Sequence, residues 1–113
     1  MERILEISIR GKGGHGSMPS KANNPILIAA QLIEKLEAEV RKVRRERGNA
    51  LLPEICLIDF NSGEKGNIIP ERAKLRLQIR TASEKQEESL SGKLTDIIEK
   101  HVQRHSATAL GKR

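Results

Sequence analysis

Apolar and polar side chains alternate along two segments of the chain, as expected of strands with one buried face. These segments are residues 3–10 and 73–80, and the more apolar run at residues 52–60 predicts a further strand. Apolar residues recur at helical spacing between about residues 25 and 47 and again after residue 83, so each of these stretches predicts an amphipathic helix. The two apolar stripes are Ile26, Ala29, Ala30, Ile33, Leu36, Val40 and Val43, and then Leu90, Leu94, Ile97, Ile98 and Val102.

Capping residues delimit the two predicted helices. Asn24 followed by Pro25 is typical of a helix start, and Gly48 is a stop signal for the same helix. Ser83 and Gln86 form a capping box at the start of the second helix. Both helices are therefore predicted from their ends as well as from their periodicity.

The elements follow the order strand, helix, strand, strand, helix and a short last strand at residues 107–110. This order predicts an α+β fold of the ferredoxin-like β-α-β-β-α-β class, with two helices on one face of a four-stranded antiparallel sheet. A chain of 113 residues suffices for one modest core, so residues 1–113 are expected to form a single domain. The first and last strands would be neighbours, which brings the termini close together, as in a domain inserted into another.

The composition narrows the classes of protein that fit. Hydrophobic residues make up 36% of the chain, which supports a folded domain. Phe60 is the only residue of the types Phe, Tyr and Trp, which disfavours a site built on aromatic stacking. The single cysteine, Cys56, excludes an intramolecular disulfide. No apolar run approaches the roughly 20 residues that span a bilayer. We see no signal peptide before the first strand, and so expect no membrane association and a cytoplasmic location.

The net charge of +6 is spread along the chain except for one basic run at residues 41–47. Cations at the end of a helix interact favourably with its dipole, so we interpret this run as a solvated helix end. A nucleic-acid-binding domain of the same fold is one alternative, although its open sheet face would carry Lys74, Arg76 and Arg80 and no stacking aromatic. A redesigned scaffold, suggested by the scarcity of aromatic residues, is another.

Three motifs occur in order along the chain. The first is the glycine-rich segment from Gly11 to Pro19 with Asn24-Pro25-Ile26 behind it, the second runs from Gly63 to Pro70, and the third is the strand that ends in Arg80. Together they resemble the lid, or dimerisation, domain of the zinc aminoacylase and carboxypeptidase G-type metallopeptidases, such as acetylornithine deacetylase and succinyl-diaminopimelate desuccinylase. The resemblance covers nearly the whole chain. Gln78 departs from it, because the family often has Asp two residues before the arginine.

The resemblance implies a two-domain parent enzyme that hydrolyses N-acyl amino acids or peptides. Its catalytic domain holds two zinc ions through His, Asp and Glu, and a Glu acts as the general base. This chain has no His-x-Asp sequence, and the adjacent Glu87 and Glu88 are expected at the exposed start of a helix. We therefore expect no metal or other cofactor in this chain and no hydrolysis by the chain alone. His101 and His105 have the spacing of a zinc-binding helix, but Val102 replaces the catalytic Glu.

The resemblance also implies roles for three residues. His15 would stabilise the oxyanion that forms when water attacks an amide, since a positioned imidazole N–H binds more strongly as negative charge develops. The glycines around His15 would permit positive φ and close approach to a partner. Asn67 would bind the same oxyanion or a substrate carboxylate, and Arg80 would clamp the terminal carboxylate of the substrate.

The strand order predicts how these three residues are arranged. His15 follows the first strand and Asn67 precedes the third, so they should be neighbours at one edge of the sheet, while Arg80 lies toward the opposite edge. We therefore expect His15 and Asn67 to serve the site of a partner subunit and Arg80 to serve its own. A homodimer would form through the edge strand at residues 52–60 and the first helix, and the parent catalytic domain would be the other partner.

Overall fold

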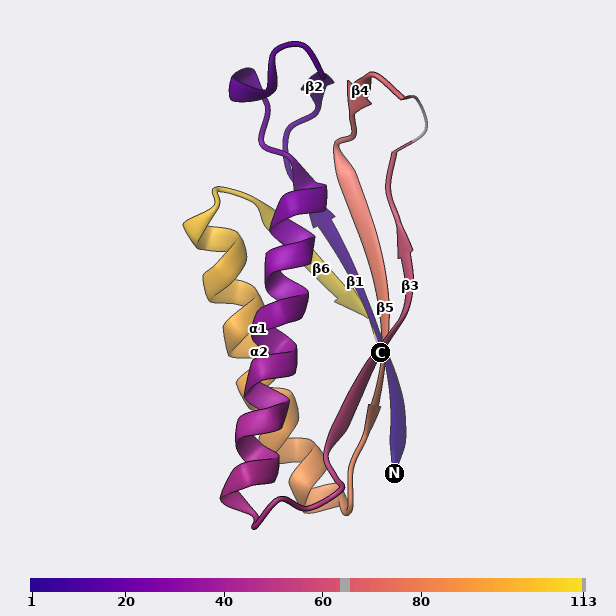
Figure 1. Cartoon of the computed structure of the whole chain (residues 1–113), viewed down its shortest axis with the longest axis vertical. Helices are drawn as coiled ribbons and strands as arrows, with labels where there is room; N and C mark the ends of the chain where they lie inside the picture. The colour runs from indigo at the N-terminus through magenta and orange to yellow at the C-terminus, as the bar shows by residue number, and fades with distance from the viewer. Residues whose placement is uncertain (64–65, 113) are drawn as a thin grey trace.

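Six longer elements build the chain in the computed structural model, which describes residues 1–63 and 66–112 (Figure 1). Their order confirms the predicted α+β fold with two helices and a four-stranded sheet. Within the described ranges, neither helix combines the length and apolarity that crossing a membrane requires. The elements are β1 (Glu2–Arg10), α1 (Pro25–Glu46), β3 (Glu54–Asn61), β5 (Arg72–Arg80), α2 (Glu84–Arg104) and β6 (Thr108–Lys112).

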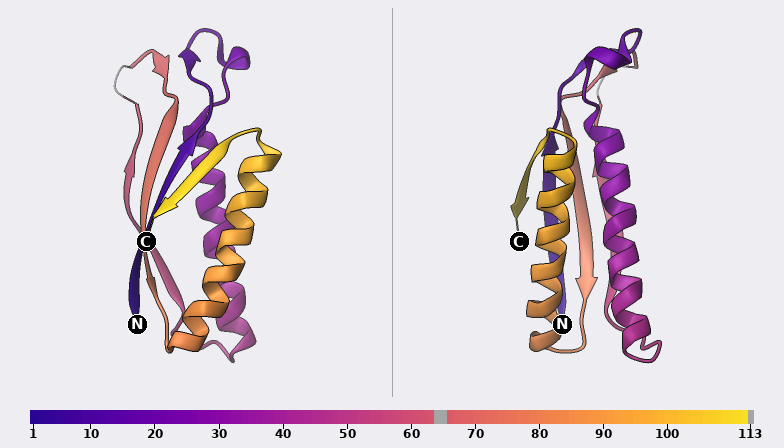
Figure 2. Two further views of the ribbon diagram at one scale, coloured as in Figure 1. Left: turned by 180° about the vertical axis from the view of Figure 1, so that it is seen from behind. Right: turned by 90° about the vertical axis from the view of Figure 1, so that its left-hand side faces the viewer.

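The four long strands form one antiparallel sheet in the order β3-β5-β1-β6. Both helices cover the same face, and the right-hand view of Figure 2 shows them in front of the sheet. The register places Glu2 opposite Arg80 at one end of the β1–β5 pair and Arg10 opposite Arg72 at the other. β3 lies at an edge of this sheet, which confirms the position predicted for the strand at residues 52–60.

The core is aliphatic, as expected of a chain with one aromatic residue. Alternate residues of β1 and β5 pack against one stripe from each helix, and burying this apolar surface drives folding. The prediction for Ala30 is wrong, because this residue is exposed and Ile28 and Leu32 face the core instead. Ala30 lies about 200° around the helix axis from Ile28, so the two cannot share a buried stripe. The buried core comprises Ile7, Ile9, Ile28, Ala29, Leu32, Ile33, Leu36, Val40, Ala73, Leu75, Leu77, Ile79, Leu90 and Leu94.

The start of α2 confirms one prediction and corrects another. The backbone N–H of Gln86 donates to Ser83 Oγ at 3.1 Å, as the capping box predicts. Glu87, however, is buried and forms an ion pair with Arg3 of β1, whereas its neighbour Glu88 is exposed as expected. Successive residues of a helix point about 100° apart, so Glu87 can face Arg3 of β1 while Glu88 faces solvent.

A two-stranded ribbon extends the sheet beyond β1 and β5, where the sequence predicts loops. It consists of β2 (Gly14–His15) paired with β4 (Ile68–Ile69), and the short 3-10 helix η1 (Pro19–Lys21) follows β2. The ribbon forms the upper end of the molecule in Figure 1. Glu64 and Lys65 of the second motif lie outside the described residues.

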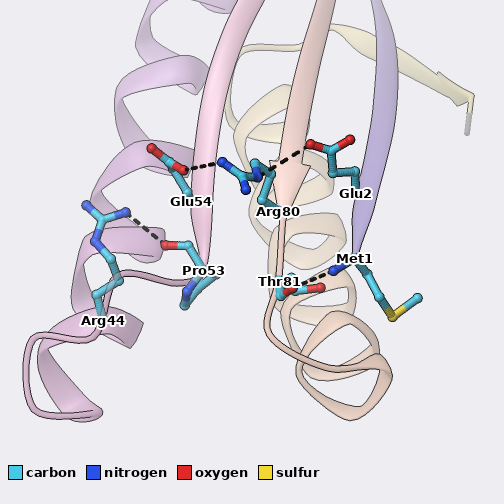
Figure 3. Close-up of polar contacts among 7 residues, drawn as sticks. All are labelled: Met1, Glu2, Arg44, Pro53, Glu54, Arg80 and Thr81. Carbon is cyan, nitrogen blue, oxygen red and sulfur yellow. Dashed lines mark hydrogen bonds and ion pairs between the residues drawn. The ribbon is translucent and has the colours of Figure 1, made fainter.

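The first and last strands are neighbours, as predicted. β6 pairs with β1 from Thr108 opposite Arg10 to Lys112 opposite Glu6. The far end of β1 is tied to β5, because the Met1 ammonium group donates to the carbonyl oxygen of Thr81 at 2.7 Å (Figure 3). β1 is therefore paired with β5 along one edge and with β6 along the other.

Candidate functional site

The structure brings His15 and Asn67 together, as the strand order predicts. His15 pairs with Ile68 in the ribbon, and the backbone N–H of Gly16 donates to the carbonyl oxygen of Asn67 at 2.8 Å. The side chains of His15 and Asn67 are both exposed. The ribbon thus places an imidazole and a carboxamide on adjacent segments at the free end of the sheet.

Glycines permit this arrangement through close backbone approach. A Cβ on Gly11 would overlap the carbonyl oxygen of Asn23, and one on Gly13 would lie 2.7 Å from the carbonyl oxygen of Ile69. No glycine between residues 11 and 16 has a positive φ, so that prediction is wrong. The backbone here is largely extended. Glycine is needed at these positions because a side chain would collide with the neighbouring backbone.

Ser17 determines which nitrogen of His15 carries the proton. The backbone N–H of Ser17 lies 3.2 Å from His15 Nδ1, and Ser17 Oγ lies 2.8 Å from the same atom. A backbone N–H can only donate, so Nδ1 accepts and the neutral imidazole carries its proton on Nε2. His15 therefore offers an N–H donor from its exposed Nε2.

Arg80 lies at the other end of the sheet. It is the last residue of β5, about 26 Å along the strand from Arg72. Its guanidinium group is held between two carboxylates on the neighbouring strands, with Nε 3.5 Å from Glu2 and Nη1 3.5 Å from Glu54 (Figure 3). The structure thus separates Arg80 from His15 and Asn67, as the topology predicts.

The open face of the sheet carries charges of both signs. Arg76 stands between Glu6 of β1 and Asp59 of β3 in the strand register, just as Arg80 stands between its two glutamates. Phe60 lies on the covered side, packed against the core. In the described part of the chain the open face therefore lacks the stacking aromatics of an RNA-binding sheet, which disfavours that alternative.

His101 is a structural histidine. Its side chain is 1% exposed, Nε2–H donates to the carbonyl oxygen of Ile28 at 2.8 Å, and Nδ1 lies 3.0 Å from Lys35 Nζ. Burial lowers the pKa of His101 below 6.5, and electrostatic interactions with Lys35, His105 and Arg104 lower it further. The hydrogen bond to the carbonyl oxygen of Ile28 opposes them. Both ring nitrogens are engaged, so the His101–His105 spacing does not form an open metal site.

Two residues of the site escape sequence reasoning. Ser17 contacts His15 directly, and its position two residues after a loop histidine was a weak signal that could have suggested it. Asn23 closes the loop that carries His15, and its partners are 11 and 82 residues away in the chain, so no local pattern identifies it.

A family model described as "Peptidase dimerisation domain" matches residues 5–106 of the chain. Among curated proteins, hippurate hydrolase of Campylobacter jejuni is 36% identical over 74 residues, covering 66% of this chain and 18% of the relative. Succinyl-diaminopimelate desuccinylase of Rickettsia bellii is 28% identical over 105 residues, covering 89% of this chain and 26% of the relative. The chain thus spans about a quarter or less of the length of these relatives.

Solved structures show the same fold. An amidase of the hydantoinase/carbamoylase family from Burkholderia ambifaria superposes with a TM-score of 0.84 at 15% identity, covering 98% of this chain and 26% of that one. A tripeptidase from Staphylococcus aureus superposes with a TM-score of 0.80 at 19% identity, covering 98% of this chain and 28% of that one. In both, this fold forms only part of a longer chain.

Proposed function

Because the chain belongs to the peptidase dimerisation domain family, we propose that it is the dimerisation and lid module of a dinuclear-zinc amidohydrolase or peptidase. The parent enzyme would act on N-acyl amino acids or peptides, and the module would be inactive by itself. Relatives roughly four or more times longer support a catalytic domain as its partner. The names of those relatives, a hydrolase of hippurate and a desuccinylase, support an amide substrate.

The zinc ions would belong to the catalytic domain. The described residues of this chain contain no group of three His, Cys, Asp or Glu side chains that could hold a metal ion. They do not fit a zinc centre. In this proposal the chain would instead help to bind the substrate and to stabilise the charge that develops on it.

The hydrogen bonding of His15 is the observation that carries the proposal. Its Nδ1 accepts from Ser17, so the exposed Nε2–H is free to donate to a substrate. When water attacks an amide carbonyl, the oxygen gains negative charge, and a donor fixed at about 3 Å binds it more strongly than it binds the carbonyl. Asn67, on the adjacent segment, would supply a second amide donor to the same oxygen or to a carboxylate.

Dimerisation through β3 and α1 is supported by the exposed edge of the sheet. Leu57 and Ile58 of β3 are 39% and 46% exposed, and Leu27 of α1 is 61% exposed. An edge strand with unpaired backbone groups and apolar side chains favours pairing with a second copy. In that homodimer, Arg80 would clamp the substrate in the site of its own subunit. His15 and Asn67 lie at the opposite end of the sheet, too far away to reach the same substrate, and would serve the partner's site.

Replacing the equivalent residues of the Campylobacter hippurate hydrolase with this chain tests the role of His15. We expect the His15→Ala variant of this chimera to lose about 100- to 1,000-fold in kcat, the usual cost of removing one oxyanion donor. His15→Gln, which keeps an N–H donor, should lose less. An active chimera whose kcat is unchanged by His15→Ala would refute the role.

A further inference from the structure

Asn23 closes the loop that carries His15, here called the His15 loop and comprising residues 11–23. The backbone N–H of Lys12 donates to the carbonyl oxygen of Asn23 at 2.8 Å, and the N–H of Asn23 donates to the carbonyl oxygen of Lys12 at 2.8 Å. This reciprocal pair joins the two ends of the loop. β2, with His15, and η1 both lie between them.

The side chain of Asn23 joins this closed base to a distant helix end. Asn23 Nδ2 donates to the carbonyl oxygen of His105 at 2.5 Å and lies 3.5 Å from that of Ser106. His105 is the C-cap residue of α2, where carbonyl groups have no partner within the helix. A carboxamide donor from the loop satisfies one of these carbonyls across 82 residues of sequence.

The end of α2 that receives this bond is itself fixed. One turn before His105, His101 is buried and donates to the carbonyl oxygen of Ile28 in α1. The loop is therefore attached to a helix end that is locked to the first turns of α1. Asn24, the next residue, caps α1 by accepting from Ile26 N–H at 3.0 Å, which holds Asn23 from its other side.

We propose that Asn23 is a positioning residue, which clamps the His15 loop to the C-terminal end of α2 and so fixes where the imidazole points. The effect of this clamp on catalysis rests on the role proposed above for His15. The attachment of the loop to α2 does not depend on that role. A donor misplaced by about 1 Å can cost a hundredfold in rate, so a loop at the free end of a sheet needs a rigid attachment. Asn23 provides one through side-chain donors that most other residues lack.

The test uses the isolated 113-residue chain and the variant Asn23→Asp, which keeps the shape of the side chain and removes its donors. We expect the amides of Lys12 and Gly16 to exchange with solvent about tenfold faster or more, because the opening of the loop becomes easier. The NMR shifts of the His15 ring should move as well, while the core amide of Leu77 in β5 should keep its protection. Asn23→Ala, which also removes the side-chain donors, should give the same changes in amide exchange and in the His15 ring shifts.

Asn49→Asp is the matched control, since Asn49 is an exposed asparagine whose side chain makes no hydrogen bond among the described residues. This variant should leave the exchange of both loop amides unchanged. Unchanged exchange at Lys12 and Gly16 in Asn23→Asp would overturn the proposal. So would equal acceleration at Leu77, because that result indicates general destabilisation and no specific positioning.

The outcome is distinguishable from failure of the proposed function. Exchange rates and ring shifts do not depend on catalysis. A loosened loop in Asn23→Asp together with full turnover in the His15→Ala chimera would retain the clamp and remove the oxyanion role of His15. A rigid loop in Asn23→Asp together with a slow His15→Ala chimera would do the reverse.

Discussion

At the scale of single residues, two histidines acquire different properties from their surroundings. His15 is exposed and has one ring nitrogen engaged by Ser17, which leaves Nε2–H as a donor. His101 is buried between α1 and α2 with both nitrogens engaged, by Ile28 and by Lys35. The first arrangement suits interaction with a substrate, and the second suits a neutral group that holds two helices together.

The buried His101 predicts a loss of stability in acid. Its pKa is lowered in the folded chain, chiefly by burial, whereas the unfolded chain takes up the proton near 6.5. The unfolded state therefore binds more protons below that pH, and the free energy of unfolding should fall as pH drops below 6.5. Protonation would also place a second cation 3.0 Å from Lys35 Nζ and remove its acceptor.

Urea unfolding between about pH 5 and pH 8 measures this dependence. His101→Gln keeps an N–H donor for Ile28 and does not titrate, so its stability should fall less in acid than that of the unaltered chain. His105→Gln is the control and should retain most of the slope. Identical slopes for His101→Gln and the unaltered chain would show that His101 does not cause the effect.

At the scale of elements, local signals predicted the helices and long strands well. The caps at Asn24 and Ser83 and the alternation in β1 and β5 each reflect contacts between near neighbours or one buried face. The β2–β4 ribbon could not be predicted in this way, because each strand has two residues and their partners are more than 50 positions apart. The pairing follows from the positions of β1 and β5, which only the fold determines.

The residues of the candidate site also fall into two groups, those that the sequence predicts and those that only the fold reveals. His15, Asn67 and Arg80 were identified by motif and placed by strand order. Ser17 and Asn23 were missed because their roles depend on the direction of single hydrogen bonds. The burial of Glu87 was missed for a related reason, since its partner Arg3 lies 84 residues away.

Two glycines in different elements predict opposite responses to alanine. Gly92 lies in α2, and a Cβ added there would have nothing within 4 Å, so Gly92→Ala should stabilise the chain by about 1 kcal/mol through helix propensity. Gly11→Ala should destabilise it by about 1–3 kcal/mol, because the methyl group would overlap the backbone at Asn23. Chemical denaturation of both variants measures these values. Equal effects of the two substitutions would contradict the close approach at Gly11.

At the scale of the whole molecule, the elongated shape separates the proposed substrate-binding residues. The principal extents are 48 × 23 × 21 Å, and the His15 ribbon and Arg80 lie toward opposite ends of the sheet. A small substrate cannot contact both on one copy. A dimer that pairs through β3 would let one copy supply the oxyanion donor and the other the carboxylate clamp. We therefore propose that the two subunits share their sites.

Co-expression of two inactive chimeric hippurate hydrolases tests that claim most directly. One copy carries His15→Ala, and the other carries an intact His15 but a disabled metal site in its catalytic domain. Random pairing of the two copies makes half of the dimers mixed. If His15 serves the partner, each mixed dimer holds one complete site out of two, so about a quarter of full activity should return. Adding Ile58→Lys to both copies should abolish the recovery by blocking strand pairing. Mixed dimers isolated with two affinity tags that show no recovered activity would contradict the claim.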